Sequence, residues 1–92
     1  MKVTVYEKSG CPQCDATKRQ LERLGVGYEV AALQDHLDVV AFAKQEGWTT
    51  APVVLVEDGE LLVDAWSGYR PDRIKALLQR RVERYGTEAQ TG

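Results

Sequence analysis

The chain has 92 residues, of which 43% are apolar and 28% are charged, and its formal net charge is −2. This length suits one small domain with a packed core, and the slight acidity disfavours general binding to nucleic acid or to membrane surfaces. No apolar run approaches the roughly 20 residues that span a bilayer, and residues 1–7 lack the apolar stretch of a signal peptide. We therefore expect a cytoplasmic monomer that binds neither nucleic acid nor membrane.

The first quarter of the chain predicts a strand followed by a helix. Residues 2–7 alternate between apolar and polar side chains, as a strand does. Pro12 fits the first position of a helix whose N-cap is Cys11. The helix continues to Leu24, because Gly25 is a natural stop. Its expected inner face consists of Ala16, Leu21 and Leu24.

A second strand and a second helix follow. Residues 28–33 predict the strand. Asp35 is then expected to cap a helix, and Asp38, three residues later, supports the cap. Gly47 ends this helix. Its apolar residues are Leu37, Val40, Ala41 and Phe42.

The remaining chain predicts a hairpin and a last helix. Residues 53–56 and 61–65 are strands around Asp58-Gly59, since Asp-Gly between two apolar runs is a strong hairpin signal. The last helix begins near Pro71-Asp72, and residues 87–92 form a flexible tail. The apolar residues at helical spacing in this helix are Ile74, Leu77, Leu78, Val82 and Tyr85.

These elements predict a single domain over residues 1–86 with the order β-α-β-α-β-β-α. The β-α-β half places its two strands parallel, with a right-handed crossover, and the hairpin adds two antiparallel strands. The expected fold class is α/β, with a four-stranded mixed sheet flanked by three helices. This order, with a Cys-x-x-Cys at the start of the first helix, resembles the thioredoxin fold.

Both cysteines of the chain lie in the tetrapeptide Cys11-Pro12-Gln13-Cys14, where the first strand gives way to the first helix. In a small chain with no other thiol, this placement is typical of a redox-active dithiol. A cysteine pair in a cytosolic protein is more often catalytic, redox-sensing or metal-binding than a structural staple. Residues three apart are neighbours on a helix, so the spacing lets one thiol react with the other.

Cys11 is the expected nucleophile, because a thiolate attacks a disulfide and a helix N-terminus stabilises negative charge. Lys8 adds positive charge three residues upstream. We assign Lys8, Pro12 and Gln13 to the support of the thiolate. Cys14, one turn further on and more buried, is the expected resolving thiol. It attacks Cys11 in the mixed disulfide and releases the reduced substrate.

Two other interpretations of the cysteines are open from the residues alone. A structural zinc site needs four ligands, and the chain offers two cysteines and one histidine, His36. We therefore expect no metal, and we expect His36 to face solvent in the first turn of the second helix. The other interpretation is a pair of inert cysteines.

Two further segments have plain structural explanations. In Thr50-Ala51-Pro52, the proline is compatible with the opening of a strand. The segment from Trp66 to Asp72 is compatible with a tight turn that starts a helix. Two large aromatic residues on either side of Ser67-Gly68 are nonetheless unusual in a bare turn.

The three segments together resemble the NrdH-type glutaredoxin-like redoxins of the thioredoxin-fold superfamily. The match extends from Val3 to about Leu78. The residues that carry it are Trp66-Ser67-Gly68-Tyr69-Arg70-Pro71-Asp72, the Cys-x-Gln-Cys form of Cys11 to Cys14, Ala16-Thr17-Lys18 and Ala51-Pro52-Val53-Val54.

The resemblance implies a dithiol-disulfide oxidoreductase. Members of this family take electrons from thioredoxin reductase and pass them to a class Ib ribonucleotide reductase. They bind no cofactor and use a redox-active disulfide, here Cys11–Cys14. The resemblance also implies that Pro52 is a cis-proline facing the cysteines, and that Thr50, Ala51 and Pro52 bind the substrate peptide, Ala51 through its backbone. The implied docking loop consists of Trp66, Ser67, Gly68, Tyr69, Arg70 and Asp72.

Besides a general thioredoxin-like reductase, two alternatives to this function are open. A glutathione-dependent glutaredoxin is favoured by Lys8 and Pro12, which resemble glutaredoxin residues. It is disfavoured by Trp48-Thr49 and by Tyr69-Arg70-Pro71-Asp72, which depart from the pattern of a glutathione site. The other alternative is a non-enzymatic thiol redox sensor or binding module.

Overall fold

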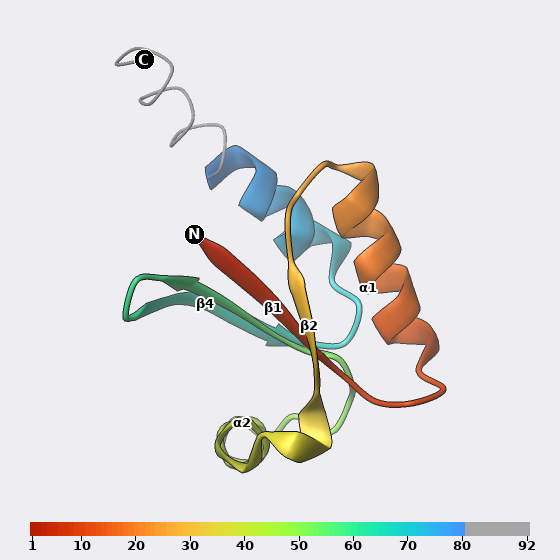
Figure 1. Cartoon of the computed structure of the whole chain (residues 1–92), viewed down its shortest axis with the longest axis vertical. Helices are drawn as coiled ribbons and strands as arrows, with labels where there is room; N and C mark the ends of the chain where they lie inside the picture. The colour runs from red at the N-terminus through yellow and green to blue at the C-terminus, as the bar shows by residue number, and fades with distance from the viewer. Residues whose placement is uncertain (81–92) are drawn as a thin grey trace.

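The computed structural model describes residues 1–80 and contains a four-stranded mixed sheet with the strand order β2-β1-β3-β4 (Figure 1). β1 and β2 are parallel, whereas the β1/β3 and β3/β4 pairs are antiparallel. The predicted fold class and element order are confirmed. The bounds are β1 Lys2–Glu7, α1 Pro12–Arg23, β2 Glu29–Ala32, the 3-10 turn η1 Leu33–Asp35, α2 Leu37–Gln45, β3 Val53–Asp58, β4 Leu61–Ser67 and a C-terminal helix over residues 71–80.

The main core lies between the sheet and two helices, α1 and the C-terminal helix. Successive side chains of a strand point to opposite faces of the sheet, and the paired residues Val5 and Val54 both point into this core. Burial against the sheet fixes α1, and therefore the cysteines at its start. The buried members of this core are Val3, Val5, Leu21, Val26, Val54, Val56, Trp66, Ile74 and Leu77.

A smaller core lies on the opposite face of the sheet, where α2 packs (Figure 1). Val53, next to Val54 in β3, belongs to this second core, as the alternation of strand side chains requires. Its buried members are Leu33, Val39, Ala43 and Val53.

Helix α1 begins and ends for the predicted reasons. Cys11 is its N-cap, with extended backbone angles, and Pro12 occupies the first turn. Gly25 follows the helix with a positive φ of 70°, which a residue with a side chain rarely adopts. Of the predicted inner face, Leu21 is fully buried, whereas Ala16 and Leu24 are half-buried.

The predicted cap of α2 is wrong. Asp35 ends the 3-10 turn η1, and His36 holds the N-cap position without a side-chain cap bond. The turn closes through a bond from His36 N to Leu33 O at 3.0 Å, and the α-helix begins only after it. The buried residues of α2 are therefore Val39 and Ala43, while Leu37 is 77% exposed.

The hairpin and the C-terminal helix lie where the sequence predicted them. β3 and β4 are longer than expected, and Gly59 takes a positive φ of 66° in the turn between them. In the C-terminal helix, Ile74 and Leu77 are buried. Predicted residues Val82 and Tyr85 and the tail over 87–92 lie outside the described residues. Among the helices within residues 1–80, none has the length and apolarity to cross a membrane.

Candidate active site

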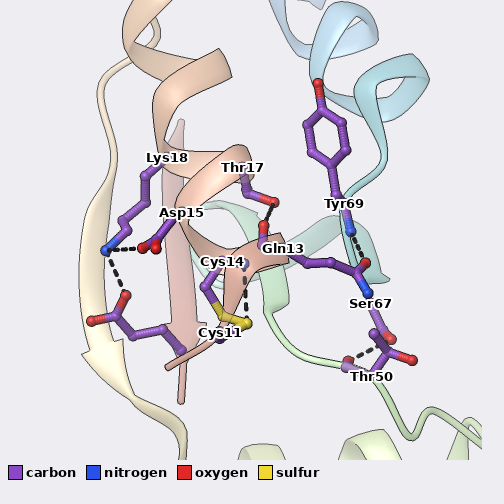
Figure 2. The surroundings of a disulfide bond; sticks show 10 residues. Cys11, Gln13, Cys14, Asp15, Thr17, Lys18, Thr50, Ser67 and Tyr69 are labelled. Carbon is purple, nitrogen blue, oxygen red and sulfur yellow. Dashed lines mark hydrogen bonds and ion pairs between the residues drawn. A yellow bond between two sulfur atoms is a disulfide. The ribbon is translucent and has the colours of Figure 1, made fainter. Parts of the chain in front are cut away.

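The two cysteines form a disulfide at the N-terminus of α1 (Figure 2). Their Cα atoms are 5.2 Å apart, within the usual range for a disulfide. Cys14 is 1% exposed, whereas Cys11 is half-buried. The more accessible residue of the pair is therefore Cys11, the predicted nucleophile.

The start of α1 directs positive charge density toward the Cys11 sulfur. Cys14 N donates a hydrogen bond to Cys11 Sγ at 3.0 Å, so the sulfur acts as the helix cap. A donated N–H favours the ionised form of the group that accepts it, and the helix N-terminus adds a partial positive charge. When the disulfide is reduced, both effects stabilise a thiolate at Cys11.

Lys8, Pro12 and Gln13, which were predicted to support the Cys11 thiolate, have different surroundings in the structure. Lys8 is exposed and makes no ion pair within the described part of the chain. Pro12 is the first residue of α1. The Gln13 carboxamide points away from the sulfurs, and Gln13 Oε1 accepts a hydrogen bond from Tyr69 N at 2.8 Å (Figure 2). A direct role of these three side chains at the thiolate stays a prediction.

An ion cluster beside the disulfide was missed in the sequence. Lys18 Nζ lies 2.7 Å from Glu7 Oε1 and 3.7 Å from Asp15 Oδ1 (Figure 2). The hydrogen bond to Glu7 raises the pKa of Lys18. The cluster ties α1 to the end of β1, the two elements that flank the cysteine loop. The i,i+3 spacing of Asp15 and Lys18 was the available signal.

The Ala51–Pro52 peptide bond is cis, as the resemblance implied. Pro52 is buried, Ala51 is half-buried and Thr50 is exposed. Pro52 O accepts a hydrogen bond from Gly68 N at 2.8 Å. Neither backbone polar group of Ala51 hydrogen-bonds to another of the described residues. Ala51 therefore offers a free backbone donor and acceptor.

The turn formed by Ser67, Gly68 and Tyr69 connects two of the predicted segments. Ser67 Oγ donates to Thr50 O at 2.8 Å, and Gln13 Oε1 accepts from Tyr69 N (Figure 2). The cysteine loop, the cis-proline segment and the start of the C-terminal helix are thus hydrogen-bonded together. The site predicted from three separate segments is one structural unit.

Trp66, which the resemblance placed in the docking loop, does not lie on this surface. It is 1% exposed and packs in the main core. The cause is the length of β4, which continues to Ser67 and pairs Trp66 with Val54. The exposed aromatic residue of the segment is Tyr69, with 36% of its surface accessible.

Arg70 and Asp72 pair with each other beyond the turn. Arg70 Nη2 lies 2.8 Å from Asp72 Oδ2, and Nε is 3.1 Å from Oδ1, which is a bidentate geometry. The Arg70 guanidinium lowers the pKa of Asp72 to about 2. At neutral pH this exposed pair is ionised, and it lies at the start of the C-terminal helix.

A second ion pair, also missed in the sequence, attaches β4 to the C-terminal helix. Arg73 Nη1 lies 2.6 Å from Asp64 Oδ1, and the Asp64 side chain is 14% exposed. Asp64 Oδ1 also accepts a hydrogen bond from Ala65 N at 2.8 Å. The pair helps to fix the helix whose first residues follow the site.

His36 belongs to no candidate metal-binding cluster among the residues that the structure describes. Its half-buried ring meets Tyr6 edge-to-face, with the ring centroids 5.1 Å apart, so it does not simply face solvent as expected. Within residues 1–80, no group of three or more His, Cys, Asp or Glu side chains is placed to hold a metal ion.

Comparison with known proteins points to one family. The glutaredoxin family model matches residues 3–62. The glutaredoxin-like protein NrdH of Escherichia coli K12 is 35% identical over 77 residues, which are 84% of this chain and 89% of that protein. The NrdH protein of Lactococcus lactis IL1403 is 29% identical over 82% of this chain and 97% of its own length.

Solved structures agree with the sequence comparison. NrdH-redoxin from Escherichia coli, a glutaredoxin-like protein with a thioredoxin-like activity profile, matches with a TM-score of 0.69 and 34% identity. The match covers 84% of this chain and 95% of that chain. A glutaredoxin from Archaeoglobus fulgidus matches with a TM-score of 0.62 and 28% identity, over 84% and 85% of the two chains.

The extent of these matches and the disulfide at the helix start lead to one assignment. The chain belongs to the glutaredoxin family, as a thiol-disulfide oxidoreductase similar to the glutaredoxin-like NrdH redoxins.

Proposed function

We propose that this protein carries electrons from thioredoxin reductase to a class Ib ribonucleotide reductase in the cytoplasm. The single observation that carries the proposal is the Cys11–Cys14 disulfide at the start of α1, with the less buried sulfur capping the helix. The likeness to NrdH proteins supports the choice of partners. The protein acts as a monomer and needs no bound cofactor beyond the disulfide.

The reaction proceeds by two thiol-disulfide exchanges. The Cys11 thiolate attacks one sulfur of the partner disulfide, and the partner's other sulfur leaves as a thiolate and takes up a proton. Cys14 then loses its proton and attacks Cys11 in the mixed disulfide. The Cys11–Cys14 disulfide closes, and the partner leaves as a dithiol. Thioredoxin reductase returns two electrons from NADPH to the disulfide.

The surroundings of the disulfide support the binding of an extended partner segment. The unpaired backbone groups of Ala51 suit a short β-type pairing with the partner, between Thr50 and Pro52. Ser67 and Gly68 border this position, because they hydrogen-bond to Thr50 O and Pro52 O. The exposed ring of Tyr69 and the polar pair of Arg70 and Asp72 then form the docking surface.

The test is reduction of the partner enzyme itself. Reduced wild-type protein should sustain turnover of a class Ib ribonucleotide reductase, and Cys14→Ser should abolish it while accumulating a mixed disulfide through Cys11. Replacement of wild-type protein by Cys11→Ser should give neither turnover nor mixed disulfide. No turnover with wild-type protein would reject the ribonucleotide reductase assignment.

A glutathione-dependent glutaredoxin is the second candidate. The exposed Lys8 and the Pro12 that opens α1 favour it, as does the likeness to the Archaeoglobus fulgidus glutaredoxin. Reduction of a glutathione mixed disulfide needs only Cys11. Cys14→Ser would therefore retain such activity if this candidate were correct, whereas it would lose activity on protein disulfides. A redox sensor would instead show slow turnover with every reductase.

A further inference from the structure

One hydrogen bond joins the cysteine loop to the turn that follows β4. Gln13 lies between the cysteines, yet its Oε1 accepts from Tyr69 N, 56 residues away along the chain (Figure 2). We propose that Gln13 is a positioning residue for partner docking, which holds the exposed Tyr69 turn in a fixed place relative to Cys11. This inference rests on the proposed function, because it concerns how the same site recognises a protein partner.

The turn has the shape that the Gln13 carboxamide needs. Gly68 has a positive φ of 80°, and a Cβ added there would lie 2.9 Å from Gln13 Oε1. The glycine therefore meets two needs at once, a left-handed backbone and room for this oxygen. A side chain at position 68 would push the carboxamide away from Tyr69 N.

The rest of the turn is attached to another part of the fold. Gly68 N donates to Pro52 O, and Ser67 Oγ donates to Thr50 O. Within residues 1–80, no side-chain hydrogen bond other than that of Gln13 joins α1 to this turn. Without Gln13, the cis-proline segment and the turn would keep their mutual bonds but lose their direct bond to the cysteine loop.

The bond therefore affects geometry more than stability. It is exposed, so water replaces the carboxamide when Gln13 is removed and Tyr69 N stays hydrogen-bonded. A protein partner must contact the docking surface and the Cys11 sulfur at the same time, and such pre-set geometry lowers the cost of reaching the reactive complex. A small disulfide contacts the sulfur alone and needs the turn less.

The experiment compares Gln13→Met, which keeps the length of the side chain and removes the acceptor, with Gln45→Met. Gln45 is exposed at the end of α2, outside the site. Each full-length variant is assayed as the disulfide substrate of thioredoxin reductase with NADPH, and the KM and kcat of the reductase are determined separately. Each is also assayed under dithiothreitol with insulin as the protein disulfide and with bis(2-hydroxyethyl) disulfide as the small one.

We expect Gln13→Met to raise the KM of thioredoxin reductase for this protein about 3- to 10-fold. A change of this size corresponds to the loss of one neutral hydrogen bond. The ratio of insulin rate to small-disulfide rate should fall by a similar factor, and Gln45→Met should match wild type in both assays. The Tyr69 amide should exchange faster with solvent in Gln13→Met. Gln13→Glu, which keeps an acceptor oxygen, should restore KM, although its charge disfavours the Cys11 thiolate and slows kcat.

Gly68→Ala tests the same contact from the other side. It should raise KM, and adding Gln13→Met to it should raise KM by less than Gln13→Met does in the wild-type background, because the added Cβ has already displaced the carboxamide. An unchanged KM together with an unchanged insulin ratio in Gln13→Met would overturn the proposal. The insulin assay needs no reductase, so failure of wild-type protein with thioredoxin reductase contradicts the proposed function, while the insulin ratio still decides the role of Gln13.

Discussion

At the scale of single residues, Trp66 and Tyr69 differ in burial, although they belong to the same segment. Trp66 is buried against the main core, with its Nε1 unpaired within the described residues. Tyr69, three residues later, is exposed, and its backbone N–H donates to Gln13 in the cysteine loop. The fold therefore depends on the tryptophan, and we propose that the exposed tyrosine is the aromatic residue that contacts a partner.

Trp66→Ala should strongly destabilise the protein. Removing a fully buried large aromatic side chain lowers the free energy of unfolding by about 3–5 kcal/mol. Urea denaturation followed by far-UV circular dichroism measures this loss, and Tyr69→Ala on the surface should change it by less than about 0.5 kcal/mol. A Trp66→Ala variant of near wild-type stability would show that the ring is not a core residue in solution.

The Arg70–Asp72 pair predicts a local response to acid. The guanidinium lowers the pKa of Asp72 from 3.8 to about 2. Because the folded pKa is depressed, the stabilisation is present above the ordinary value and is lost as the pH falls through about 2. An NMR titration of the Asp72 carboxyl carbon measures the midpoint, and Arg70→Gln should move it upward. A normal midpoint in wild-type protein would mean that the pair does not persist in water.

At the scale of elements, α1 and α2 differ in how strongly their sequences specify them. α1 has a proline in its first turn and a glycine after its end, and both signals act locally. α2 is preceded by the 3-10 turn η1, which no residue of the sequence marks and which shifts the start of the helix. In this helix Val39 and Ala43 are buried, whereas Leu37 is exposed.

Paired substitutions in α2 test this orientation. Val39→Ala should lower the free energy of unfolding by about 2 kcal/mol, because it removes buried methyl groups from the smaller core. Leu37→Ala should change it by less than about 0.5 kcal/mol, since that side chain is 77% exposed. Chemical denaturation of both variants supplies the comparison. A larger loss for Leu37→Ala than for Val39→Ala would contradict the orientation of α2 in this structure.

At the scale of the whole molecule, the element order and the cysteine pair could be predicted, because each signal is contained in a few neighbouring residues. Contacts between distant segments could not. The bond from Tyr69 N to Gln13 crosses the site, and the burial of Trp66 depends on two extra residues in β4. The expected strand ended at Ala65, which left Trp66 outside the sheet and suggested a surface role.

The same limit applies to the ion pairs around the site. Glu7 and Lys18, and likewise Asp64 and Arg73, come from different elements that meet only in the folded chain. Their charges are visible in the sequence, but their partners are set by how α1 and the C-terminal helix pack on the sheet. The sequence therefore predicts the reacting sulfurs better than the groups that hold their surroundings in place.

The most direct test of the central claim is NADPH consumption with a protein disulfide, driven in parallel by thioredoxin reductase and by glutathione with glutathione reductase. We predict turnover with thioredoxin reductase and little with glutathione, because Cys11 and Cys14 act as a dithiol pair for protein partners. Turnover mainly with glutathione would contradict the account and would identify the chain as a glutathione-dependent glutaredoxin.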